Sequence, residues 1–154
     1  MSGVFGAIFT GVVNKENVRK LAAHSRQRGF GASGLIYNCE KGYRVARADY
    51  DITKMLRQEE WSKSTVVMGH SSKAICGLKA NQLVVRDGIF LIHDGIILND
   101  EDTCKARGIE PHSRENAEVI IGIALEHLNA TGNLIELSHK IMETCEGTLS
   151  GVLA

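Results

Sequence analysis

The stretch Q-L-V-V-R-D-G-I-F-L-I-H-D-G-I-I-L-N, residues Gln82–Asn99, carries a strong local signal for the fold. It holds two apolar runs separated by Asp87-Gly88, and an Asp-Gly pair is typical of a two-residue turn between antiparallel strands. The pattern predicts a hairpin of strands over Gln82–Arg86 and Ile89–His93. The segment Gly95–Asn99 leaves that hairpin.

Two helices and a strand are expected after the hairpin. The clearest helix covers Arg114–Leu128, where apolar residues recur at spacings of three and four. A second helix is predicted over Leu134–Cys145, and Thr148–Leu153 is typical of a strand. Because this strand has no turn or cap after it, we expect the chain to be truncated at its C-terminus.

The sequence before the hairpin alternates between strands and helices. Asn14 can cap a helix over Lys15–Arg28, and the glycine-rich segment Arg28–Gly34 would break it. Strands are expected over 4–13, 35–39, 43–50 and 64–70, with a short helix over 53–61 and an irregular segment over 71–81. This order of elements predicts an α+β layered domain.

The composition is that of one globular domain over residues 1–154. The chain is 44% hydrophobic, and 18 Lys+Arg balance 18 Asp+Glu, so the net charge is zero. Neutral charge argues against a nucleic-acid partner or a polybasic membrane surface. No apolar run reaches the roughly 20 residues of a membrane helix, and the N-terminus lacks the basic region of a signal peptide.

Cysteines and histidines do not predict a metal site or a cofactor. Cys39, Cys76, Cys104 and Cys145 are far apart without a C-x-x-C pair, and the six histidines lack ligand-type spacing. Widely spaced single cysteines are typical of reduced thiols, so we expect a cytoplasmic protein. His70 and His93 follow strands and are interpreted as packing residues.

Five sequence blocks resemble the class II glutamine amidotransferases, the N-terminal-nucleophile glutaminase domains of glucosamine-6-phosphate synthase, asparagine synthetase and phosphoribosylpyrophosphate amidotransferase. Met1–Phe9 is similar to M-C-G-I-x-G-A, and R-G-F-G-A-S-G at Arg28–Gly34 to R-G-x-D-x-x-G. G-H-S-S-K-A-I-C-G at Gly69–Gly77 resembles G-H-T-R-W-A-T-H-G, and Ile92–Asn99 resembles V-H-N-G-x-I-x-N. R-E-N-A-E-V-I at Arg114–Ile120 resembles the S-D-T-E-V-I helix start. The blocks follow the family's order at similar spacing.

The resemblance implies a fold and a reaction. The fold is an N-terminal-nucleophile hydrolase-like αββα four-layer sandwich, and family domains are longer than this chain. The reaction is hydrolysis of glutamine to glutamate and ammonia for transfer to an acceptor. The partners implied are glutamine or another small amide, and a downstream synthase or transferase domain or a partner chain.

The positions that match the family's catalytic residues are altered. The nucleophile position is Ser2 in place of cysteine, and removal of Met1 would free its α-amine as a base. A serine hydroxyl ionises less readily than a thiol, so attack should be slower. The oxyanion-hole positions are Asp94 and Gly95. Gly95 retains its N–H, whereas an ionised Asp94 can only accept hydrogen bonds where the family asparagine donates.

The positions that match the substrate-binding residues have lost their charges. Ser72 replaces the arginine that binds the glutamine α-carboxylate, and Asn116 replaces the aspartate that binds the α-amine. Lys73 could supply a cation one residue later, although it is not a bidentate arginine. Arg28 is retained, and in the family it holds the N-terminal loop. An engineered nucleophile would explain Ser2, but not Ser72, Asp94 and Asn116.

These substitutions favour a pseudoenzyme, a glutaminase-like domain that has lost hydrolysis and serves in binding, regulation or assembly. Two alternatives remain open. One is an N-terminal-serine amidohydrolase acting on another amide through Ser2. The other is an active ammonia-supplying domain whose ligands lie elsewhere in the site. Glutamate release and acylation of Ser2 separate the three hypotheses.

Overall fold

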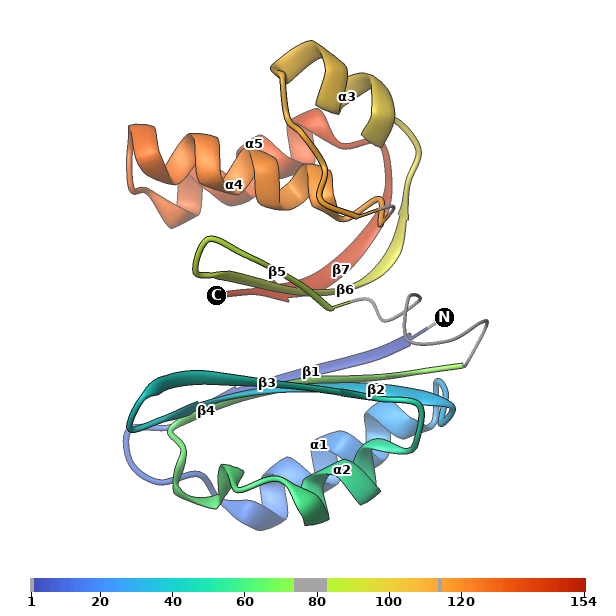
Figure 1. The fold of residues 1–154 in the computed structure, drawn as a ribbon, viewed down its shortest axis with the longest axis vertical. Coiled ribbons are helices and arrows are strands. Elements are labelled where there is room, and N and C mark those ends of the chain that lie inside the picture. The colour runs from blue at the N-terminus through green and yellow to red at the C-terminus, as the bar shows by residue number, and fades with distance from the viewer. Residues whose placement is uncertain (1, 74–82, 114) are drawn as a thin grey trace. The chain divides into compact units, whose positions relative to one another are not determined.

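The chain divides into two units, Met1–Leu83 and Val84–Ala154 (Figure 1). The structure is a computed structural model that describes residues 2–73, 83–113 and 115–154. The Ala74–Gly77 end of the third family-like block, Gln82 and Arg114 therefore lie outside the described residues.

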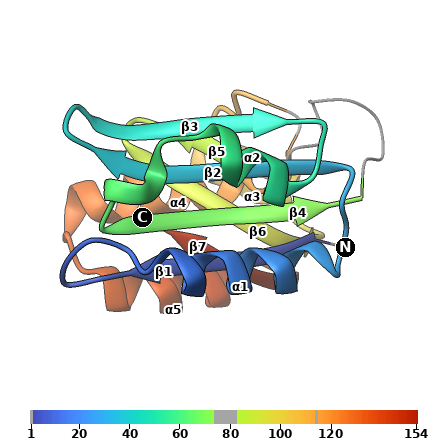
Figure 2. The same ribbon diagram turned by 90° about the horizontal axis from the view of Figure 1, so that it is seen from below.

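The first unit is a four-stranded antiparallel sheet, called sheet A, with helices on one face (Figure 2). Its strand order is β1-β4-β2-β3. The strands are β1 (Ser2–Ile8), β2 (Ala32–Cys39), β3 (Gly42–Ala48) and β4 (Val66–Ser72). The helices are α1 (Lys15–Arg26), α2 (Ile52–Gln58) and a 3-10 turn, η1 (Trp61–Lys63). Phe5, Leu35 and Val67 from the strands pack with Val18 and Ile52 from the helices in one buried core.

Helix α1 begins where the sequence predicts. The Asn14 side-chain oxygen accepts hydrogen bonds from the backbone N–H groups of Glu16 (3.0 Å) and Asn17 (3.1 Å). The helix ends at Arg26, two residues before the predicted end, because the Gln27 N–H bonds to the His24 carbonyl in a tighter turn. Strand β1 also ends early, at Ile8 instead of Val13.

Asp51 connects the two helices of the first unit. Its Oδ1 accepts hydrogen bonds from the Thr53 N–H (2.7 Å) and the Thr53 hydroxyl (2.6 Å) at the start of α2. Its Oδ2 pairs with Arg26 at the end of α1. We expect Asp51→Ala to lower the free energy of unfolding by about 1–2 kcal/mol, because α2 loses its N-cap. Urea unfolding followed by circular dichroism would measure the loss.

Asp51→Asn is the matched control, since asparagine caps as well as aspartate and removes only the charge. Burial, the largest influence, would raise the pKa of Asp51, but hydrogen bonds from Thr53 and Arg26 outweigh it and hold the pKa below its ordinary 3.8. A depressed pKa stabilises the fold above pH 3.8, and this stabilisation is lost as the pH falls through the lowered pKa. The stability difference between wild type and Asp51→Asn should therefore shrink below pH 3.8. A difference that is constant with pH would contradict this role.

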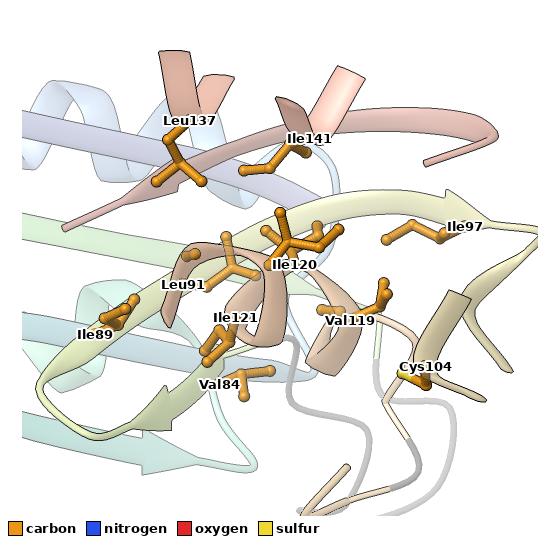
Figure 3. Close-up of a cluster of buried hydrophobic side chains, with 13 residues drawn as sticks. Val84, Ile89, Leu91, Ile97, Cys104, Val119, Ile120, Ile121, Leu137 and Ile141 are labelled. Atoms are coloured by element: carbon orange, nitrogen blue, oxygen red, sulfur yellow. The ribbon is translucent and has the colours of Figure 1, made fainter. Parts of the chain in front are cut away.

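The second unit is a three-stranded sheet, called sheet B, with strand order β5-β6-β7. The strands are β5 (Leu83–Arg86), β6 (Ile89–Ile97) and β7 (Gly147–Leu153). The helices are α3 (Asp100–Arg107), α4 (Glu118–Ala130) and α5 (Leu134–Thr144). Leu91 from the sheet packs with Ile120, Ile121 and Leu137 from α4 and α5 in a buried core (Figure 3).

The predicted Asp-Gly hairpin is present. Asp87 (φ 48°) and Gly88 (φ 83°) both adopt positive φ, which is the requirement of a type I′ turn. The helix predicted from Arg114 begins only at Glu118, and β6 continues to Ile97 instead of ending at His93. Helix α3 was not expected, because its sequence D-E-D-T-C-K-A-R lacks an apolar stripe and buries only Thr103 and Cys104.

Candidate functional site

Ser2 and Ser72 face each other at one end of sheet A. They are register partners on the antiparallel strands β1 and β4, and both are buried. In an antiparallel ladder, opposite residues alternate between pairs that share backbone hydrogen bonds and pairs that do not. The Phe9 N–H bonds to the Thr65 carbonyl, so Phe9–Thr65 is a bonded pair. Counting back along β1 in steps of one residue, Ser2–Ser72 is a pair without mutual backbone hydrogen bonds. Side chains of such pairs lie close together on one face of the sheet. Within the described residues, the Ser72 hydroxyl has no hydrogen-bond partner.

The loop after α1 packs on the end of β4. The Gly31 N–H donates to the Ser72 carbonyl (2.9 Å). A Cβ on Gly29 would lie less than 3.0 Å from the backbone of Ser72 and Lys73, so only glycine allows this approach. The neighbouring Arg28 and Lys73 are exposed. Four predicted site residues, Ser2, Arg28, Ser72 and Lys73, therefore gather in the first unit.

Helix α1 also determines where β1 begins. The Ser25 hydroxyl donates to the Gly3 carbonyl (2.6 Å), and this bond is buried. A Cβ on Gly3 would lie less than 3.0 Å from the Ser25 backbone, so helix and strand are in direct contact at this point. Because Gly3 is held against Ser25 in this way, the position of the preceding residue, Ser2, is restricted as well.

Asp94 and Gly95 lie on β6 in the second unit. Gly95 has φ +148°, and a Cβ there would lie less than 3.0 Å from the Thr148 carbonyl on β7. Phe90 and Ala154 exchange both backbone hydrogen bonds, so they form a bonded pair of the antiparallel ladder. Bonded and non-bonded pairs alternate along the strands, so Asp94–Ser150 is also a bonded pair. The next pair, Gly95–Leu149, has no mutual backbone hydrogen bonds. The Gly95 N–H therefore points away from β7. Asp94 is the preceding residue on the same strand.

Asn116 is joined to His93, which is fully buried. The His93 Nε2 lies 3.2 Å from the Asn116 Oδ1. An amide oxygen only accepts hydrogen bonds, so Nε2 carries the proton in this contact. The contact ties the segment before α4 to the residue that precedes Asp94. Asp94, Gly95 and Asn116 therefore come from neighbouring parts of the second unit.

The sequence reading overlooked Ser113 and Glu115, which lie beside Asn116 and Glu118. The Ser113 hydroxyl donates to the Glu118 Oε1 (2.8 Å), and the Glu118 side chain is buried. Burial, followed by the charge of Glu118, raises the pKa of Glu115. In the sequence, these residues appear only as a polar segment before an apolar helix. Such a segment predicts the start of a helix but not a buried carboxylate.

The described residues show neither a metal-binding cluster nor a membrane-spanning helix. Residues 2–73, 83–113 and 115–154 contain no group of three or more His, Cys, Asp or Glu side chains arranged to hold a metal ion. No helix in the same ranges is long and apolar enough to span a membrane. The described cysteines, Cys39, Cys104 and Cys145, are free thiols.

Comparison with known proteins establishes the fold. No family model matches the sequence, and no curated protein matches it. Among solved structures, the chain is similar to the glutamine phosphoribosylpyrophosphate amidotransferase from B. subtilis complexed with ADP and GMP, with a TM-score of 0.71 and 17% identity. It is also similar to a structure described as the allosteric regulatory enzyme of purine biosynthesis, with a TM-score of 0.72 and 18% identity.

Both similarities cover 100% of this chain and 35% of the matched chain, so the chain spans about a third of their length. The fold is therefore that of the matched part of these chains, an α+β fold of the N-terminal-nucleophile hydrolase type. This confirms the predicted fold class, and it supports the resemblance to a class II glutamine amidotransferase domain that the five sequence blocks suggested. At this level of identity, the similarity concerns the fold alone.

Proposed function

We propose that residues 1–154 form one glutaminase-like domain, part of a longer amidotransferase-type protein, in which glutamine hydrolysis is impaired or lost. Its role would be to bind a small amide or to regulate a synthase or transferase domain or partner chain. The length of the matched amidotransferases supports such a partner, since this chain covers only 35% of each. The free thiols of the described cysteines support a cytoplasmic location.

The observation that carries this proposal is the neutral side chain of Asn116 and its hydrogen bond with His93. A carboxylate at this position would attract the glutamine α-ammonium, whereas Asn116 is neutral and its Oδ1 is engaged with His93. The α-carboxylate position has a comparable loss, because Ser72 offers a buried hydroxyl where the family has a guanidinium. A hydroxyl lacks the charge and the bidentate geometry that arginine brings to a carboxylate.

The chemistry at β6 supports the same conclusion. Gly95 keeps an N–H directed away from β7, but Asp94 stands at the other donor position. Loss of one oxyanion-hole donor costs about 10²–10³ in rate, and an ionised carboxylate would also repel the developing negative charge. The nucleophile adds a further loss, since Ser2 must react through an alcohol.

Glutamate release from saturating glutamine tests the proposal. We expect the purified wild-type protein and Ser2→Ala to release glutamate at the same background rate. Mass spectrometry of the N-terminus would establish first that Met1 has been removed, so that a blocked α-amine is not mistaken for a dead site. Release above background that disappears in Ser2→Ala would contradict the proposal and assign the chemistry to Ser2.

The second candidate, an N-terminal-serine amidohydrolase, is favoured by the hydrogen bond that fixes the start of β1 against α1. The bond from Ser25 to Gly3 places Ser2 in a buried, ordered strand, which suits a nucleophile that must hold one position. An activated acyl ester separates the candidates. Acylation of Ser2 in wild type, absent in Ser2→Ala, would support this candidate, whereas an unmodified Ser2 supports the non-catalytic domain.

A further inference from the structure

Strand β7 forms an open edge of sheet B. Within the part of the chain that the structure describes, β7 pairs only with β6. Because Ser150 forms a bonded pair with β6, the backbone N–H and C=O groups of the alternate residues point away from β6. These alternate residues are Gly147, Leu149, Gly151 and Leu153. The edge therefore offers a row of backbone donors and acceptors, and an extended strand is the structure that can pair with such a row.

The sequence of β7 does not protect this edge. Proteins commonly block an exposed sheet edge with charged side chains or proline. Strand β7 reads G-T-L-S-G-V-L and contains neither, whereas β5, at the opposite edge of the same sheet, ends in Arg86. The backbone is also accessible, since Gly147–Gly151 is exposed throughout. An unprotected edge of this kind indicates a surface that another strand covers.

Apolar hollows lie along the helix side of the same edge. Two hollows, of about 240 and 250 Å³, both have Ile141, Met142 and Leu149 in their walls. The larger one also includes Gly151 and Leu153. Met142 is 78% exposed and Leu149 is 42% exposed, so apolar side chains border both hollows. Because side chains alternate along a strand, a strand added at this edge would place every second side chain on this face.

The strand that fits this edge is a second copy of β7. A two-fold interface requires a surface that is complementary to itself. If two copies of β7 pair antiparallel about Ser150, Leu149 lies opposite Gly151 of the second copy, and Leu153 lies opposite Gly147. Each leucine therefore meets a residue without a side chain. In this register the backbone groups that point away from β6 all meet in bonded pairs.

The other face of the paired strands is complementary as well. Thr148 would lie opposite Val152 of the second copy, a pair of β-branched residues that suits a sheet. Ser150 would lie opposite its own copy, so no charge is brought into the interface. We propose that the chain forms a dimer through β7, in which two copies of sheet B join into one continuous antiparallel sheet. The inference goes beyond the proposed function, and glutamate release does not bear on it.

Sedimentation equilibrium of the whole chain at increasing protein concentration tests this dimer. We expect the mass to rise from 16.8 kDa towards twice this value. Leu149→Lys should weaken the dimer by at least about 10-fold, because a lysine blocks an edge strand and removes an apolar contact. Val85→Lys is the matched control, since Val85 is 38% exposed on β5, the opposite edge strand. Its dimer should be as stable as that of the wild type.

Cysteine cross-linking tests the register. Ser150→Cys would place two thiols opposite each other in a pair without mutual hydrogen bonds, where Cα atoms are about 4.5 Å apart, a separation that a disulfide can bridge. Diamide would take up the two thiol hydrogens and leave a disulfide-linked dimer. Thr148→Cys is the matched control, because Val152 of the second copy lies opposite it. This control should cross-link no more than the wild type, whose own cysteines give the background.

A further variant keeps the test decisive if Leu149→Lys does not fold. Met142 is largely exposed on α5, so Met142→Lys should fold and should weaken the dimer several-fold. A wild-type monomer at every concentration, including one whose β7 edge binds a strand of another protein, would overturn the proposal. Equal dimerisation of wild type and folded Leu149→Lys, or equal cross-linking of Ser150→Cys and Thr148→Cys, would overturn it as well.

Discussion

Restoring the four altered family positions together is expected to raise glutamate release by at least about 100-fold over the wild-type protein. The variant is Ser2→Cys, Ser72→Arg, Asp94→Asn and Asn116→Asp. Under the proposed assignment of these positions, it would return a thiol nucleophile, an oxyanion donor and both charges that bind the zwitterion. The expected gain follows from the donor alone, which contributes about 10²–10³ in related sites.

The single substitutions should show little gain, because residues that act as one unit are strongly non-additive. The matched control is the triple variant that retains Ser2, which separates substrate binding from the nucleophile. Urea unfolding of each variant is needed, since arginine at the buried Ser72 position can destabilise β4. A folded quadruple variant that releases no glutamate would contradict the assignment of these four positions.

Gly95→Ala is expected to destabilise the second unit by at least about 2–4 kcal/mol. The residue has φ +148°, a conformation that L side chains rarely adopt, and the added Cβ would overlap the Thr148 carbonyl. Backbone strain and steric overlap act at the same place, so neither can relax without separating β6 from β7. Urea unfolding, with a probe of the second unit such as hydrogen exchange in β6, would measure the loss.

Gly88→Ala is the matched control for this effect. Gly88 also has positive φ (+83°), but a Cβ there would meet no atom within 4 Å. Its substitution should therefore cost only the conformational strain, about 1 kcal/mol. Equal losses at Gly95 and Gly88 would mean that the close approach of β7 does not constrain Gly95.

The elements read correctly from the sequence are those that depend on neighbouring residues. The Asp87-Gly88 turn follows from the φ angles that aspartate and glycine tolerate, and the Asn14 cap follows from a side chain that reaches the next turn. The apolar spacing that predicted a helix over Arg114–Leu128 lies within α4, but the start of this helix was placed four residues too early. Local sequence marks its apolar stripe more clearly than its first turn.

The sequence by itself determined the residue types at each position, and hence the loss of charge at Ser72 and Asn116 and the carboxylate in place of an amide at Asp94. Tertiary structure alone decided which of these residues are neighbours. His93 and Asn116 are 23 residues apart, and Ser2 meets Ser72 only because β1 and β4 pair in that register. The ion pair between Arg86 and the buried Glu118, which are 32 residues apart in the sequence, likewise depends on how β5 and α4 pack. Charge and propensity are properties of a residue, whereas pairing and burial depend on the packing of segments far apart in the chain.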